Sequence, residues 1–340
     1  MTSATTSEGT PFVTPDVLAA LRTAVGAAYV TTDPAERLLR SQDVFLWDEA
    51  PLVDLVVQPG SAAEVAAVLR VAVDNAIAVA PRGGGVSYTK GYVAAGTPTL
   101  SLDLGRLSEI HELNVEDRYV TVGAGCTWEA LARALRPHGM RSAVRGPISG
   151  SVATVGGVAA QNSGSASMAG YLSLEVVLPN GTIVHTGSAG RAAHPSPFYR
   201  NYGPDLTGLF LGDTGALGIK TRCTLAIEPV PPGIAFASVA FDELATMVEV
   251  MNAIARRGIP CRVLGLDPLK NRTATQVGIR EGIATLAGVV RGAGSIATGL
   301  RQAAGMAAGG QHALDDVRWS MHLTVEGLDQ PAADRALAAH

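Results

Sequence analysis

The stretch PRGGGVSYTKG, Pro81 to Gly91, decides the fold prediction for this chain of 340 residues. It follows the apolar run AIAVA, which is typical of a buried strand that leads into a loop. The three glycines Gly83 to Gly85 lack a Cβ, so their backbone N–H groups can come close to a ligand. Converging N–H groups form an anion-binding nest, and a neighbouring guanidinium or hydroxyl group adds donors. The stretch therefore predicts a phosphate-binding loop.

The common phosphate-binding patterns do not fit this loop. The nicotinamide-nucleotide fingerprint G-x-G-x-x-G opens a helix, whereas this loop lacks the third glycine and continues as YTKGYVAAGTP. The pattern GxxxxGK[ST] occurs nowhere in the chain, and GVSYT, Gly85 to Thr89, lacks the last glycine of a nucleophile elbow. Because many Gly-rich turns bind nothing, the ligand has to be identified from the rest of the sequence.

Composition favours a globular protein of two domains, because 340 residues exceed what one core usually serves and 47% of them are apolar. The net charge of -4, without a block of Lys or Arg, disfavours nucleic-acid binding. The sequence shows neither a signal peptide nor an apolar span, so we expect a cytoplasmic location. Cys126, Cys223 and Cys261 lie far apart and no HxH spacing occurs, so we expect neither a metal site nor a disulfide framework.

The pattern along the chain predicts a β-α-β unit before the glycine loop. DLVVQP is typical of a strand, and the helix that follows begins with a capping box formed by Ser61 and Glu64. Further on, an Asn180-Gly181 turn predicts a hairpin.

The proline-rich stretch VPPG, Val230 to Gly233, predicts a domain boundary, after which a helix capped by Asp242 is expected. The strand VRWSMHLTVEG has no evident second half of its sheet, and the final helix DQPAADRALAAH stops at His340. We therefore expect a helical lead-in over residues 1–47, a central domain over 48–232 and an incomplete domain over 233–340.

Four blocks together resemble one family, the flavin-dependent oxidases and dehydrogenases that share the vanillyl-alcohol-oxidase or PCMH type of FAD-binding domain. The resemblance implies an α+β fold with two FAD-binding subdomains, followed by an α+β cap domain that would continue past His340. The blocks are PRGGGVSYTKG, RYVTVGAGCTWEAL, ATVGGVAAQNSGS and DLTGLFLGDTGALGIKTRCTLAIEP, in the family's order over about Asp48 to Pro232.

The resemblance also implies which residues bind FAD. The glycine loop would hold the pyrophosphate, and the ATVGG segment would line the flavin and its phosphates from the other subdomain. Thr154 and Asn162 have alternative roles as a helix cap and a turn residue. The implied cofactor-binding residues are Arg82, Gly83, Gly84, Gly85, Val86, Ser87, Pro147, Thr154, Gly156, Gly157, Asn162, Gly218 and Ile219.

Attachment of the FAD is expected to be non-covalent. Several members of the family carry a His just before the loop serine and link it to the flavin, but this chain has Val86 there. The segment from Ala143 to Gly157 contains no Cys or His either. A valine methyl group offers no nucleophile, so binding must rest on non-covalent contacts.

The implied activity is that of an FAD-linked oxidase or dehydrogenase in which an alcohol, 2-hydroxy acid or phenol passes hydride to flavin N5. The electron acceptor, whether oxygen, a cytochrome or a quinone, stays open, as does formation of a homo-oligomer. Two alternatives remain: a non-catalytic flavin-binding subunit, and an enolpyruvyl reductase, which the closing block disfavours. The catalytic base is unassigned among the polar candidates Tyr88, Tyr199, Tyr202, Arg200 and Arg272.

Overall fold

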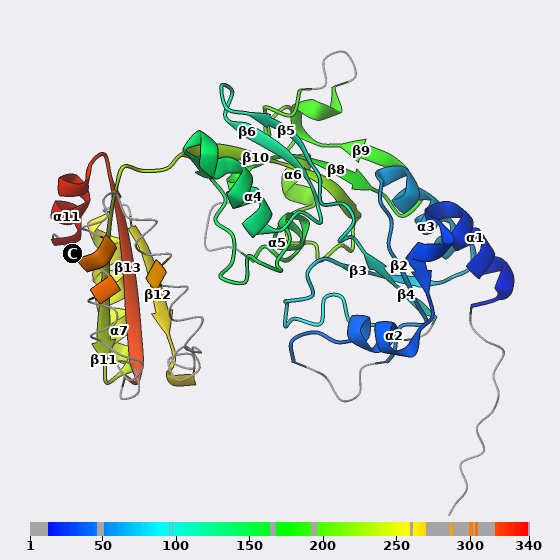
Figure 1. Cartoon of the computed structure of the whole chain (residues 1–340), viewed down its shortest axis with the longest axis horizontal. Helices are drawn as coiled ribbons and strands as arrows, with labels where there is room; N and C mark the ends of the chain where they lie inside the picture. Colours follow the sequence, from blue (N-terminus) through cyan, green and yellow to red (C-terminus); the bar gives the residue numbers. More distant parts are fainter. Residues whose placement is uncertain are drawn as a thin grey trace, which may run out of the picture. The chain divides into compact units, whose positions relative to one another are not determined.

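The junction at Val230 divides the chain into two units, Met1–Val230 and Pro231–His340, within the VPPG stretch singled out above. Both units contain helices and sheets (Figure 1), so the predicted α+β class is confirmed. The computed structural model describes residues 13–45, 51–94, 96, 98–163, 168–191, 196–258, 261–269, 286–287, 299–301, 303–304 and 317–338.

The first subdomain of unit 1 is a four-stranded sheet with the strand order β1-β2-β4-β3. Strands β2 and β3 each pair in parallel with β4, which therefore lies between the two strands of the predicted β-α-β unit. The lead-in belongs to this subdomain, because β1 pairs with β2 and α1 packs on α3. The elements are α1 (Pro15–Val25), β1 (Val30–Thr31), α2 (Pro34–Ser41), β2 (Leu55–Val57), α3 (Ala62–Asp74), β3 (Ala78–Arg82) and β4 (Thr99–Asp103).

Helix α3 begins as the capping pattern predicts. The Ser61 hydroxyl accepts a hydrogen bond from the Glu64 backbone N–H at 3.1 Å, and the Glu64 carboxylate accepts one from the Gly60 N–H at 2.8 Å. One N–H group of the first helical turn and one N–H group just before the helix are thus satisfied. The apolar face of α3 is buried against the sheet, which fixes the strand β3 that feeds the glycine loop.

The second subdomain is a six-stranded antiparallel sheet in the order β5-β6-β10-β8-β9, with β7 paired to β10. The predicted hairpin is confirmed, because β8 and β9 pair across the turn at Gly181, whose φ is +79°. The elements are β5 (Ile110–Asn114), β6 (Tyr119–Gly123), α4 (Trp128–Leu135), β7 (Met140–Ser142), α5 (Val155–Gln161), β8 (Tyr171–Val177), β9 (Ile183–His185), α6 (Leu206–Leu209) and β10 (Ile219–Pro229).

A buried tyrosine ties α5 to this sheet. Tyr171 is fully buried on β8, and its hydroxyl donates a 2.8 Å hydrogen bond to the carbonyl of Val155, the first residue of α5. Desolvation raises the pKa of this phenol well above its usual value, so it stays a neutral donor. Val155, Val158 and Ala159 bury the apolar side of the helix in the same core.

Unit 2 is a three-stranded antiparallel sheet in which β13 pairs with β11 on one side and with β12 on the other. The expectation that this strand lacks a partner was therefore wrong, because residues distant in sequence supply both neighbours. The predicted cap at Asp242 was also wrong, since Glu243 is the N-cap and makes no side-chain cap hydrogen bond. The elements are β11 (Gly233–Phe241), α7 (Leu244–Arg257), β12 (Cys261–Leu266), β13 (Trp319–Gly327) and α11 (Gln330–Ala338).

Within the described ranges, none of the helices combines the length and the hydropathy needed to cross a bilayer.

Replacing Tyr171 by Phe tests the anchor of α5. The substitution leaves the Val155 carbonyl buried without its hydroxyl donor, so we expect the free energy of unfolding to fall by about 1 to 2 kcal/mol. Urea unfolding followed by circular dichroism measures the change. Tyr202→Phe is the matched control, because the Tyr202 side chain is 52% exposed. Equal midpoints for the two variants would contradict the assignment.

Candidate functional site

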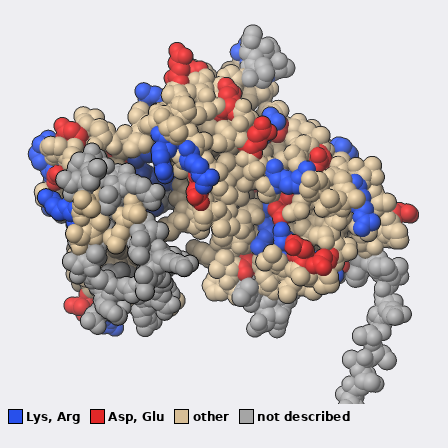
Figure 2. All heavy atoms as spheres, viewed as in Figure 1, with Lys and Arg blue, Asp and Glu red and all other residues tan. Residues whose placement is uncertain are grey.

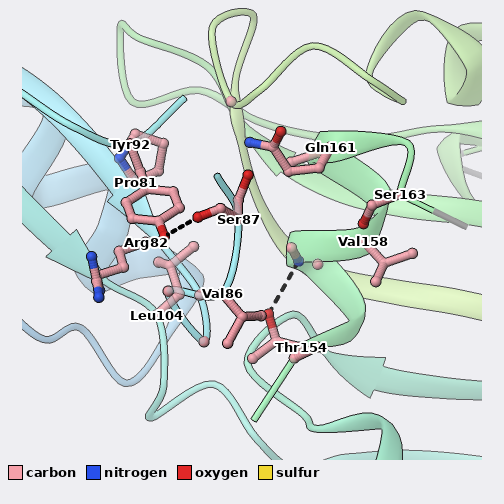
Figure 3. A pocket seen from close by; sticks show the side chains of 18 of the residues that line it. Pro81, Arg82, Val86, Ser87, Tyr92, Leu104, Thr154, Val158, Gln161 and Ser163 are labelled. Atoms are coloured by element: carbon pink, nitrogen blue, oxygen red, sulfur yellow. Dashed lines mark hydrogen bonds between the residues drawn. The ribbon is translucent and has the colours of Figure 1, made fainter. Parts of the chain in front are cut away.

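A cavity of about 500 Å³ lies between the two subdomains of unit 1 (Figure 3). One side is the end of β3 and the loop that follows it, residues 81–89. The other side is formed by α5 and the segment before it, and by residues 214–220 at the start of β10. Two stretches that lie far apart in the sequence thus face each other across one cavity.

Each glycine of the loop is required for a different steric reason. A Cβ on Gly83 would lie 2.4 Å from the Thr154 hydroxyl, and one on Gly84 would lie 2.0 Å from the Val152 carbonyl oxygen. Gly85 has φ +66°, in the left-handed region that side chains disfavour. The loop therefore packs directly on the backbone that precedes α5, which leaves its own backbone exposed to the cavity.

Arg82 fixes this loop through contacts with Gln42 and Tyr92. Its guanidinium donates a 2.8 Å hydrogen bond to the Gln42 carbonyl and lies 4.8 Å from the ring centre of Tyr92. The Tyr92 hydroxyl in turn donates to the Ser87 carbonyl at 3.0 Å, and Figure 3 shows the Arg82 side chain turned away from α5. Burial lowers the pKa of Arg82, but an arginine stays charged at neutral pH. The side chain fixes the loop while the main chain lines the cavity.

Helix α5 reaches the cavity because small residues let it approach β6. A Cβ on Gly156 would lie 2.5 Å from the Cβ of Ala124. Thr154 is the N-cap, accepting a 3.1 Å hydrogen bond from the Gly157 N–H, and its side chain also lines the cavity. Asn162 ends the helix in the left-handed region at φ +49°. Asn162 is the one predicted cofactor residue that does not line the cavity, and its role toward the cofactor stays a prediction.

The other predicted residues come together. Gly83 to Ser87, Pro147, Gly156, Gly157, Gly218 and Ile219 all line the cavity together with Arg82 and Thr154.

Sequence reasoning missed Lys220. This lysine also lines the cavity, although its side chain is only 3% exposed. A lysine placed directly after the apolar LGI, in a strand that is otherwise largely buried, was the available signal.

The charges of the cavity wall favour an anionic ligand. Among the described residues that line it, Arg82 and Lys220 are cationic, and none is Asp, Glu, His or Cys. On the visible face of unit 1, Figure 2 shows basic and acidic side chains interspersed.

Most of the candidates for the catalytic base do not line this cavity. Tyr88 lines the cavity and is 65% exposed. Tyr199, Arg200 and Tyr202 lie together around a different hollow beside α6. Arg200 is engaged there with Asp205 at 2.8 Å, and this contact lowers the pKa of the Asp205 carboxyl. Arg272 lies outside the described residues. In the described parts of the chain no cluster of His, Cys, Asp or Glu could hold a metal ion.

Comparison with known proteins identifies the domain. The family model described as FAD binding domain matches residues 53–187. A probable mitochondrial D-lactate dehydrogenase of Danio rerio is 31% identical over 251 residues, which cover 72% of this chain and 49% of that protein. A D-2-hydroxyglutarate dehydrogenase of Xanthomonas citri is 33% identical over 235 residues, which cover 68% of this chain and 49% of that protein. The chain thus spans about half the length of these curated relatives.

Solved structures agree on the fold. p-Cresol methylhydroxylase with bound substrate aligns with a TM-score of 0.71 and 19% identity, over 95% of this chain and 62% of that one. Alkyldihydroxyacetonephosphate synthase aligns with a TM-score of 0.68 and 17% identity, over 96% of this chain and 58% of that one. The chain therefore contains an FAD-binding domain of the PCMH type. Its cofactor is FAD, whose diphosphate suits a cavity with exposed loop backbone and two cations.

Substitution of Gly84 by Val tests the loop. The new side chain would meet the Val152 carbonyl, so the loop must move away from α5 and we expect FAD affinity to fall at least about tenfold. Titration of the apo-protein with FAD, followed by flavin fluorescence, measures the dissociation constant. Gly96→Val is the control, because no atom lies within 4 Å of a Cβ at Gly96. Unchanged affinity in Gly84→Val would contradict the role of this loop.

Proposed function

We propose that the chain is the FAD-binding part of an oxidoreductase that takes hydride from a carbon bearing a hydroxyl group, with 2-hydroxy acids as the leading donors. The observation that carries the proposal is the sequence match itself. Relatives named for D-lactate and D-2-hydroxyglutarate each match about two thirds of this chain or more. Phenols are the second candidate, because p-cresol methylhydroxylase shares the fold.

Bound FAD would supply the hydride-accepting N5 atom. The chain's own part is to bind and orient the cofactor. The backbone N–H groups of Gly83 to Gly85 would hold the diphosphate, and the loop stays in place because Arg82 and Tyr92 brace it. Leu104, Val158 and Ile219 supply apolar surface in the cavity wall, which favours burial of flat rings and excludes water.

Other features of the protein belong to the proposal as well. The electron acceptor is oxygen, a cytochrome or a quinone, and a homo-oligomer is one form that the protein could take. A cytoplasmic location rests on the sequence alone, whereas the relative from Danio rerio is named as mitochondrial.

Anaerobic reduction of the bound flavin tests the donor class. The FAD-loaded product of the complete gene is mixed with D-lactate or D-2-hydroxyglutarate, and absorbance near the flavin maximum is recorded. We expect a 2-hydroxy acid to bleach the flavin, because hydride transfer from the donor reduces it. L-Lactate and p-cresol serve as controls for stereochemistry and donor class.

The same experiment separates the alternatives. Bleaching by p-cresol alone would replace 2-hydroxy acids with phenols. Bound flavin that no donor bleaches, but that dithionite reduces, would favour the non-catalytic flavin-binding subunit. Bleaching by a reduced nicotinamide together with turnover of an enolpyruvyl ether would favour the reductase.

A separate prediction is that FAD is bound non-covalently. Val86 lines the cavity where several family members carry the linking His, and the described wall contains no His or Cys. Cys126 and Cys223 are buried in the core, and burial raises the pKa of Cys223 to about 12. Acid precipitation should therefore leave the yellow colour in the supernatant. A yellow pellet, with a polypeptide mass increased by one FAD, would overturn this prediction.

A further inference from the structure

Lys220 and Asp213 form an ion pair at the edge of the FAD cavity. Lys220 is the second residue of β10, and its ammonium group contacts the Asp213 carboxylate. Each side chain is 3% exposed. Burial lowers the pKa of Lys220, while the contact with Asp213 acts in the opposite direction. Pairing with the carboxylate thus favours the charged ammonium form inside the protein.

The carboxylate also organises the turn that precedes β10. Asp213 accepts a 2.9 Å hydrogen bond from the Gly215 N–H. Thr214 and Gly215 both have positive φ, at +53° and +87°. The turn is joined to α5 through hydrogen bonds from the Gly212 and Thr214 N–H groups to the Ala159 and Ala160 carbonyls, at 2.9 and 2.8 Å. The ion pair therefore sits at a fixed place relative to α5.

Only the cationic member of the pair lines the cavity. Lys220 lines the cavity wall, whereas Asp213 does not. The other cation of the wall, Arg82, already donates to the Gln42 carbonyl and lies against the Tyr92 ring. The turn also lies beside the end of β3, because a Cβ on Gly215 would be 2.6 Å from the Pro81 ring. Lys220 is thus a buried cation that lines the same cavity as the glycine loop.

We propose that the Lys220 ammonium group is a direct contact for the diphosphate of FAD, held in place by Asp213 as a positioning residue. An ammonium group has three N–H donors. The carboxylate and the Gly218 carbonyl, at 3.4 Å, account for two of them, which leaves one for a ligand oxygen. A buried ion pair adds little stability on its own compared with apolar residues, so a role toward the ligand accounts for its position.

Two near-isosteric substitutions test this inference, which rests on FAD occupying the cavity. Lys220→Met removes the proposed contact and leaves an uncompensated carboxylate, so the dissociation constant of FAD should rise about tenfold or more. Asp213→Asn keeps an oxygen acceptor for both the Gly215 N–H and the Lys220 ammonium group, so Lys220 stays in position, and it removes negative charge, so its FAD affinity should equal or exceed that of the wild type. Fluorescence titration of each apo-protein with FAD at pH 6 measures both constants.

ADP and riboflavin are the probes that locate the contact. ADP carries the diphosphate without the flavin, and riboflavin carries the flavin without a phosphate. Competition titrations should show that Lys220→Met lowers the affinity for ADP by a factor similar to that for FAD. The affinity for riboflavin should stay unchanged. A lower affinity for riboflavin with an unchanged affinity for ADP would overturn the assignment to the diphosphate.

A role limited to bracing the turn predicts a different pattern. Lys220→Met and Asp213→Asn would then lower the affinity for FAD equally, because each breaks the same ion pair. This result would overturn the proposal. Unchanged affinity in both variants would overturn it as well. If Lys220→Met fails to fold, the double variant Lys220→Met with Asp213→Asn takes its place. It should bind FAD about tenfold more weakly than Asp213→Asn alone, and equal affinity would refute the contact.

Arg222→Met is the matched control for charge. Arg222 lies two residues further along β10, its side chain is 49% exposed, and it does not line the cavity. The substitution removes one positive charge from the same strand, so the FAD affinity should stay within about twofold because exposed charges are screened. If wild-type apo-protein does not bind FAD at all, the cofactor assignment fails and not only the role of Lys220.

Discussion

The contact between Gly84 and the Val152 carbonyl is the constraint on which the cavity depends. A Cβ at Gly84 would come within 2.0 Å of that oxygen, so the loop of one subdomain can touch the backbone of the other only without a side chain. Gly83 is subject to the same limit from Thr154, and Gly156 from Ala124. The absence of side chains at Gly83 and Gly84 thus lets the two subdomains meet at the cavity, and the absence of one at Gly156 lets α5 approach Ala124.

Polar groups buried around this contact hold the cavity in one shape. Arg82 is fixed to the segment after α2, Tyr171 fixes the start of α5, and Asp213 fixes the turn before β10. Each group is paired, because an unpaired buried polar group would cost about 1 to 3 kcal/mol. A site pre-organised in this way loses less entropy when FAD binds. If FAD occupies this cavity as proposed, the fold holds the backbone donors in place for the diphosphate.

Local features were predictable from the sequence and non-local ones were not. The glycine loop, the Ser61 cap and the Asn180-Gly181 hairpin follow from backbone preferences of a few residues, and the structure contains all three. The position of β4 between β2 and β3, and of β13 between β11 and β12, depends on pairing between distant segments. Arg82 and Lys220 acquire their roles from partners that lie 40 and 7 residues away. Asn162 matched a family pattern but lies outside the wall.

Calorimetric titration of the apo-protein with FAD and with FMN tests the central claim most directly. If the glycine loop, α5 and the two cations form a site for a dinucleotide, FAD will bind at one site per chain. FMN, which lacks the diphosphate and the adenosine, will bind at least about a hundredfold more weakly, since several charge-assisted hydrogen bonds are lost. Equal affinity for FAD and FMN, or no binding of FAD by well-folded apo-protein, would contradict the account.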